Sequence, residues 1–181
     1  MQKSALIDSD VNYNWNFLNY PIHTVSAKPE QISKECAILL IHGFGASTDH
    51  WRFNIPVLST KYEVHAIDLL GFGKSPKPQD VEYSGSLWKD QVVAYVKEKI
   101  KKPTIVVGNS LGGYAALAAG AELNELNAGV ILLNAAGYFS EEKTIKKNML
   151  QTSIETVAGI FLKNIVPVSY THLTLPTMMS V

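Results

Sequence analysis

Apolar residues in this chain follow two patterns, short unbroken runs and longer stretches with a spacing of three to four residues. The unbroken runs at 36–41 and 129–133 predict strands that are buried on both faces, as in a parallel sheet. Residues 62–67 and 104–109 predict two further strands. The chain therefore contains the strands of a mostly parallel sheet.

Between these strands the spacing changes to that of amphipathic helices. We predict helices over 47–58, with Ser47 or Thr48 as the cap, over 87–101, and from 111 to about 123. Strands that alternate with helices of this length indicate βαβ units. The predicted fold class is therefore α/β.

Both ends of the chain lie outside this alternation. Two short strands at 13–18 and 21–27 are expected to form a hairpin. Residues 141–165 are typical of one or two amphipathic helices, and no further βα unit follows. The last segment, 168–181, fits neither pattern.

Composition narrows the class of protein. The chain has 181 residues, 46% of them apolar and 18% charged, with a formal net charge of zero. This length predicts one domain, and the neutral charge indicates neither a nucleic-acid partner nor an anionic membrane surface. No apolar run approaches the roughly 18 residues of a membrane span. Residues 1–10 are polar and Cys36 is the single cysteine, so we expect a cytoplasmic protein.

The clearest chemical signal is a Gly-x-Ser-x-Gly motif at 108–112. It joins a predicted strand to a predicted helix, a setting in which a strained turn exposes a serine hydroxyl as a nucleophile. Gly108 and Gly112 remove side chains that would collide where the chain reverses. The N-terminus of the following helix directs N–H groups toward the place where negative charge would develop. We therefore predict Ser110 as a catalytic nucleophile.

Attack on an acyl carbon also requires hydrogen-bond donors for the oxyanion that forms. The N–H of Leu111 is the first predicted donor, and the N–H of Phe44, in a glycine turn after an earlier strand, is the second. Tyr114 is expected to line the pocket. Supporting roles are expected for further residues of the two turns: His42, Gly43, Gly45, Gly108, Asn109, Gly112 and Gly113.

Three segments, at 42–45, 68–75 and 108–113, together resemble the α/β-hydrolase superfamily in their order and spacing. Their sequences are His-Gly-Phe-Gly, Asp-Leu-Leu-Gly-Phe-Gly-Lys-Ser and Gly-Asn-Ser-Leu-Gly-Gly, and the resemblance covers residues 13–137. Within that superfamily the chain is similar to pheophytinase-like hydrolases and to hydrolases of carbon–carbon bonds in dienone acids. The resemblance implies a three-layer α/β-hydrolase fold, a serine nucleophile, and no metal or organic cofactor.

The same resemblance implies a late acidic residue and a histidine base, and here the chain departs from the family. After Ser110 the sequence has no aspartate, and its one histidine, His172, has neighbours unlike the family's histidine loop. We expect His172 not to be the base, and we expect neither the acid nor the base in this chain. One interpretation explains the absence of both the acid and the base. On it, the chain is cut short inside the lid, the helical cap that the family inserts after its sixth strand, and the last two strands are missing.

On this interpretation residues 1–137 form the N-terminal part of the hydrolase core. Residues 138–167 begin a helical cap, and 168–181 are a non-native tail, with a genuine short terminal segment as the alternative. The earlier histidines are expected to be structural or solvated: His23, His42, His50 and His65. Asp68 is expected to support a loop at the end of its strand.

The predicted function is hydrolysis of a small-molecule carboxylic ester or related acyl substrate. Two alternatives are a carbon–carbon bond hydrolase of the same fold and a non-catalytic binding protein with a hydrolase-like fold. A remoter one is a dinucleotide-binding domain, because Gly43 and Gly45 precede a helix and Asp68 ends the next strand. Thr48 stands where that fingerprint requires its third glycine. The sequence makes no prediction of oligomeric state.

Overall fold

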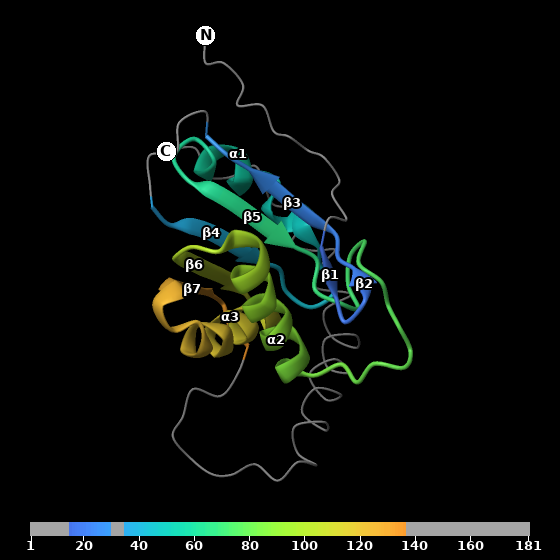
Figure 1. Cartoon of the computed structure of the whole chain (residues 1–181). Coiled ribbons are helices and arrows are strands. Elements are labelled where there is room, and N and C mark those ends of the chain that lie inside the picture. The colour runs from blue at the N-terminus through green and yellow to red at the C-terminus, as the bar shows by residue number, and fades with distance from the viewer. Residues whose placement is uncertain (1–14, 30–34, 137–181) are drawn as a thin grey trace. The chain divides into compact units, whose positions relative to one another are not determined.

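A five-stranded sheet forms the centre of the protein (Figure 1). The computed structural model describes residues 15–29 and 35–136, all within one compact unit. The strand order is β3-β5-β4-β6-β7, and all neighbours are parallel except β3, which runs antiparallel to β5. The strands are β3 (Thr24–Ala27), β4 (Ala37–Ile41), β5 (Glu63–Ile67), β6 (Thr104–Asn109) and β7 (Asn127–Leu133). The predicted α/β class with a mostly parallel sheet is confirmed.

The predicted N-terminal hairpin is present but shorter than expected. Strands β1 (Asn16–Phe17) and β2 (Tyr20–Pro21) pair antiparallel. The predicted strand at 21–27 is divided, because its second part, β3, leaves the hairpin and joins the main sheet. The buried His23 lies at this break, where its carbonyl accepts a hydrogen bond from the Asp68 N–H at 2.9 Å.

Helices cover both faces of the sheet and complete three layers. On one face α2 (Gly85–Tyr95) and α3 (Leu111–Glu122) pack against alternate residues of the strands, such as Leu39 and Ile41 of β4. On the other face η1 (Thr48–Trp51) and α1 (Asn54–Leu58) pack against the residues between them. All of β4 is buried, so its residues face apolar surroundings on both sides. That is why its sequence is an unbroken apolar run.

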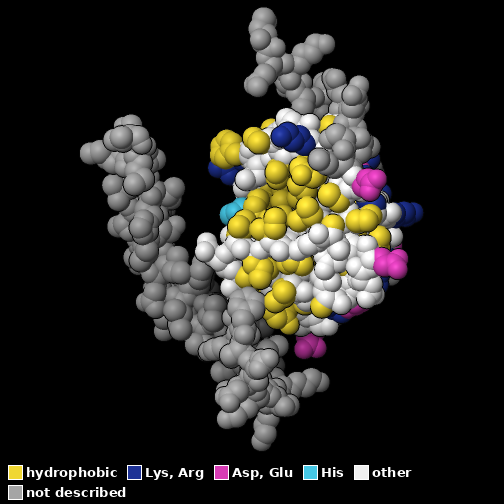
Figure 2. Space-filling model, turned by 90° about the vertical axis from the view of Figure 1, so that its left-hand side faces the viewer, with side chains coloured by type: hydrophobic (Ala, Val, Ile, Leu, Met, Phe, Trp, Pro, Cys, Tyr) yellow, Lys and Arg dark blue, Asp and Glu magenta, His cyan; other side chains and the backbone are white. Residues whose placement is uncertain are grey.

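Strand β7 differs from its prediction. Its sequence predicts burial on both faces, but Ile131, Leu132 and Leu133 are 48%, 38% and 39% exposed. Consecutive strand residues point to opposite faces, so both faces of β7 are partly uncovered. The reason is its place at the edge of the described sheet, beside β6 alone. Figure 2 shows hydrophobic side chains gathered on the side of the molecule where β7 lies in Figure 1.

The helices begin and end at positions that differ from the prediction. The single helix expected at 47–58 is divided into η1 and α1, although Ser47 does cap its start by accepting a hydrogen bond from the Asp49 N–H. The helix expected at 87–101 begins at Gly85, and its last turn is the π-helical η2 (Val96–Ile100). A short 3₁₀ turn, η3 (Asn124–Leu126), follows α3.

The predicted cap at 138–167 and the suspected tail at 168–181, with His172, lie outside the described residues. Within residues 15–29 and 35–136 no helix has both the length and the apolar character needed to cross a membrane.

Candidate active site

Ser110 lies between the end of β6 and the start of α3, as its motif predicts. Its backbone has φ 51° and ψ −117°, in the left-handed region that a residue with a side chain rarely adopts. Four backbone hydrogen bonds fix this conformation. The Ser110 N–H donates to the Leu133 carbonyl at 3.0 Å, and the Ser110 carbonyl accepts from Gly113 and Ala136, each at 2.9 Å, and from Tyr114 at 3.3 Å. The strained backbone is therefore held by the first turn of α3 and by the C-terminal end of β7 with the residues after it, which is typical of functional turns.

The glycines on either side of Ser110 are required by close backbone contacts. A Cβ atom on Gly108 would overlap the carbonyl group of Gly112. A Cβ atom on Gly112 would overlap the carbonyl oxygens of Ile41 and His42. A Cβ atom on Gly113 would come within 2.5 Å of the Ala135 Cβ. The turn can therefore form only with very small residues at these positions.

The glycine turn at 42–45 packs directly against this serine. A Cβ atom built on Gly43 would lie 3.1 Å from the Ser110 Cβ and 3.1 Å from the Asn109 Oδ1. Gly45 has φ +68°, with open space beside it. The backbone N–H groups of Phe44 and Leu111 have no acceptor among the described residues. The fold thus brings together the two turns that were predicted to supply hydrogen-bond donors.

His42 holds the glycine turn in place. Its Nδ1–H donates to the Gly43 carbonyl at 2.7 Å, and its Nε2 accepts a hydrogen bond from the Leu69 N–H at 3.0 Å. Burial lowers the pKa of His42, which favours the neutral ring that this arrangement requires. Both ring nitrogens are engaged, so His42 is structural, as expected.

The other described histidines are also occupied away from Ser110. His23 lies 3.1 Å from an Asp68 oxygen, and His65 bridges Glu63 at 3.0 Å and the Tyr95 hydroxyl at 3.1 Å. His50 is exposed and contacts the Trp51 ring. No histidine or carboxylate in the described part of the chain forms a hydrogen bond with the Ser110 hydroxyl.

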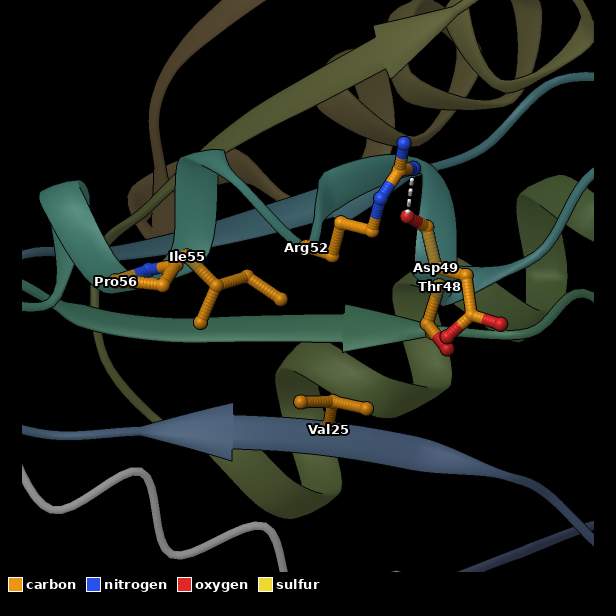
Figure 3. Close-up of a pocket in the computed structure, with 6 residues that line it drawn as sticks. All are labelled: Val25, Thr48, Asp49, Arg52, Ile55 and Pro56. Carbon is orange, nitrogen blue, oxygen red and sulfur yellow. Dashed lines mark hydrogen bonds between the residues drawn. The ribbon is translucent and has the colours of Figure 1, made fainter.

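The side chains of Phe44, in the glycine turn, and of Tyr114, the predicted pocket residue, lie at the surface. Phe44 is 46% exposed and Tyr114 is 39% exposed, with the Tyr114 ring against Gly85. A shallow pocket of about 170 Å³ lies elsewhere, between β3 and the η1–α1 segment (Figure 3). None of its lining residues belongs to the predicted site: Val25, Thr48, Asp49, Arg52, Ile55 and Pro56.

Asp68 supports a loop, as predicted, and this counts against the dinucleotide alternative. Its carboxylate accepts hydrogen bonds from the N–H groups of Thr48 at 2.6 Å and Lys74 at 2.7 Å. The side chain is fully buried, so it is not available to a ribose hydroxyl. Among the described residues no cluster of histidine, cysteine and carboxylate side chains could hold a metal ion.

Comparison with known proteins agrees with this architecture. The family profile described as the alpha/beta hydrolase fold matches residues 37–175, which is most of the chain. The chain belongs to the α/β-hydrolase fold family.

Two relatives within this family illustrate the similarity. The chain is 37% identical over 112 residues to 2-hydroxy-6-oxo-6-(2'-aminophenyl)hexa-2,4-dienoic acid hydrolase from Metapseudomonas resinovorans, covering 58% of this chain and 37% of that protein. It is 33% identical over 133 residues to chloroplastic pheophytinase from Arabidopsis thaliana, covering 57% of this chain and 28% of that protein. Both relatives belong to the groups that the sequence motifs resemble.

Among solved structures, the fold is similar to that of a bacterial membrane phospholipase A. The TM-score is 0.62 and the identity 32%, over 70% of this chain and 40% of that one. The chain therefore spans only about a third of the length of the relatives it matches.

The sequence predictions missed one residue at this site. Phe72 packs its ring against both His42 and Phe44, with centroids 5.9 and 5.3 Å apart. Phe72 lies in the segment at 68–75, which carries part of the family resemblance, and that membership is the sequence signal that could have identified it.

Proposed function

We propose that the protein is a serine hydrolase of carboxylic esters or related acyl substrates, with Ser110 as the nucleophile. The observation that supports this most is the left-handed backbone of Ser110 at the start of α3, with the turn at 42–45 packed against it. A non-catalytic binding protein has no use for that strained geometry. The family relationship supports the same reaction class.

In the proposed reaction the Ser110 Oγ attacks the carbonyl carbon of the substrate, and the carbonyl oxygen becomes an oxyanion. The N–H groups of Leu111 and Phe44 donate hydrogen bonds to this oxygen, which stabilises the tetrahedral intermediate. The leaving group departs with a proton, and water then hydrolyses the acyl-enzyme. No described histidine reaches Ser110, so the base that takes the Oγ proton lies outside the described residues.

The test is covalent labelling of the chain with a fluorophosphonate, followed by intact mass measurement and peptide mapping. We expect one adduct per chain, on Ser110, and none in Ser110→Ala. Ser86→Ala is the matched control, because Ser86 is exposed on α2 and should not affect labelling. Because no described residue serves Ser110 as a base, labelling is expected to be slow and is followed to completion. An adduct on another residue, or no adduct on Ser110 after prolonged incubation, would contradict the proposal.

Turnover is expected to be slow. Residues of a catalytic triad act as a unit, and loss of the base alone costs on the order of 10⁶-fold in rate. The measurement is steady-state hydrolysis of a p-nitrophenyl ester. A rate close to that of an intact hydrolase, abolished by Ser110→Ala, would show that an effective base is present after all.

Carbon–carbon bond hydrolysis is the second candidate, and it is favoured by the identity with the dienoic acid hydrolase. The same nucleophile and donors would serve a ketone carbonyl next to the bond that breaks. A 2-hydroxy-6-oxo-dienoic acid assayed beside the p-nitrophenyl ester distinguishes the two, since preference for the dienoic acid would replace the ester proposal.

A further inference from the structure

The segment at 68–75 is tied to the glycine turn that precedes η1. The Leu69 N–H donates to His42 Nε2 at 3.0 Å, and one turn later the Phe72 ring meets the rings of His42 and Phe44 edge to face. The Asp68 carboxylate binds the N–H of Thr48, three residues beyond the turn. Contacts therefore reach the turn at its start, at its tip and just after its end.

The other side of this segment is anchored to α2. The Trp88 Nε1–H donates to the Leu70 carbonyl at 3.0 Å, and the Gln91 Oε1 accepts from the Leu70 N–H at 2.8 Å. The Trp88 ring also packs against Phe72, with centroids 5.7 Å apart. Trp88 and Gln91 are both buried. Phe72 thus stands between a rigid helix and the turn.

Phe44 has few other means of holding its position. Its side chain is 46% exposed, and its N–H has no acceptor among the described residues. Within the described part of the chain, the ring of Phe72 is its one aromatic neighbour. An edge-to-face pair fixes both the separation and the tilt of the two rings.

We propose that Phe72 is a positioning residue for the oxyanion turn. Its ring packs against Trp88 of α2 on one side and against Phe44 on the other. It thereby fixes Phe44 relative to α2 and keeps the Phe44 N–H directed at the place where the oxyanion forms. This inference rests on the proposed function and adds a role for the segment at 68–75. Phe72 itself does not touch the reacting atoms.

The test compares two phosphonylating reagents that differ only in P=O or P=S. The oxygen accepts hydrogen bonds from the donors, whereas sulfur accepts them poorly, so the ratio of the two labelling rates at Ser110 reports on the donors. We expect Phe72→Ala to lower this ratio about three- to tenfold, as loss of an aromatic contact at this position predicts. Phe72→Tyr, which retains the ring, should restore it.

Phe53→Ala is the control for loss of a phenylalanine, because Phe53 is 73% exposed and lies outside the segment. If Phe72→Ala does not fold, Phe72→Leu keeps much of the apolar volume and removes the ring. The amide ¹⁵N order parameter of Phe44 gives a measurement independent of chemistry, and we expect it to fall in either variant.

An unchanged P=O to P=S ratio together with an unchanged Phe44 order parameter would overturn the role of Phe72 alone. A wild-type chain without any adduct on Ser110 would overturn the proposed function, and this inference with it. A ratio that falls equally in Phe53→Ala would mean that the effect is not specific to this contact, which also overturns it.

Discussion

At the scale of single residues, the candidate site depends on two groups that have almost no freedom. Ser110 is held at φ 51° by hydrogen bonds to Leu133, Gly113 and Ala136. His42 is fixed as one tautomer by bonds at both ring nitrogens. Such fixed geometry is what electrostatic stabilisation of a transition state requires, because nothing has to reorganise when charge develops.

We expect Gly108→Ala to lower the free energy of unfolding by about 2 kcal/mol, because its new methyl group would overlap the backbone of Gly112. Denaturant unfolding followed by circular dichroism measures this. Gly85→Ala is the control. Its methyl group would meet the Tyr114 ring, which is 39% exposed and can move aside. Equal losses in the two variants would contradict the steric argument.

Local sequence was sufficient to predict the turn around Ser110, because the motif at 108–112 is recognisable by itself. Gly108 is required by a contact within the motif, with Gly112, whereas Gly112 is required by Ile41 and His42 of an earlier strand and turn. The role of His42 and the contact of Phe72 could not be predicted in the same way. His42 binds Leu69, and Phe72 contacts Phe44. The two partners of each pair become neighbours only after β4 and β5 have paired. The pairing brings their C-terminal ends together, and no periodicity along the chain encodes that.

At the scale of secondary structure, the types of element were predictable and several boundaries were not. The helix α2 starts earlier than its apolar spacing indicates, because the Ser84 hydroxyl accepts a hydrogen bond from the Leu87 N–H at 3.2 Å. The apolar run at 129–133 predicts a buried strand, or an exposed apolar edge where no further strand pairs with it. The structure places β7 at the edge of the described sheet, because a strand's composition does not reveal its position in the sheet.

The cap of α2 gives a prediction at this scale. Ser84→Ala should lower the free energy of unfolding by about 1 kcal/mol, since it leaves an N-terminal N–H of the helix without its acceptor. Thermal or denaturant unfolding measures the loss. Ser86→Ala, two residues inside the same helix and exposed, should be neutral or slightly stabilising. A neutral Ser84→Ala would mean that water replaces the cap at no cost.

At the scale of the whole molecule, an ionic cluster around the buried Glu63 joins three parts of the chain near the start of β5. Glu63 is 7% exposed and binds His65 Nε2 at 3.0 Å, Lys28 at 3.0 Å and also Lys102. His65 lies in β5 itself, Lys28 directly follows β3, and Lys102 lies just before β6. The hydrogen bond from His65, with those from Lys102 and Lys28, holds the pKa of Glu63 well below its usual range.

This cluster predicts a loss of stability in acid. A carboxyl with a lowered pKa in the folded state contributes stability that is complete above its unfolded pKa, roughly 4.3, and is lost as the pH falls below that value. Glu63→Gln should therefore lower the free energy of unfolding by about 2–3 kcal/mol at pH 7, and by progressively less as the pH falls from about 4 to 3 and below. Denaturant unfolding at a series of pH values checks this.

The exposed Glu125 supplies the control, because Glu125→Gln should leave the pH dependence unchanged. An equal effect of Glu63→Gln at pH 7 and pH 3 would show that the side chain stabilises by packing and not by its charge. The buried His42 also lowers the stability of the folded state as the pH falls, but over a higher pH range than Glu63. Its lowered pKa means that stability also declines as the pH falls below about 6.5.

The position of β4 in the sheet has a consequence for how the protein is made. β4 pairs with β5 on one side and with β6 on the other, and the segment that includes α2 lies between those two neighbours in the chain. During synthesis at about 5–20 residues per second, the apolar β4 therefore waits for several seconds with one edge unpaired. Over that interval the edge of β4 that later pairs with β6 is open to pairing with a strand of another chain, and only the synthesis of β6 closes it.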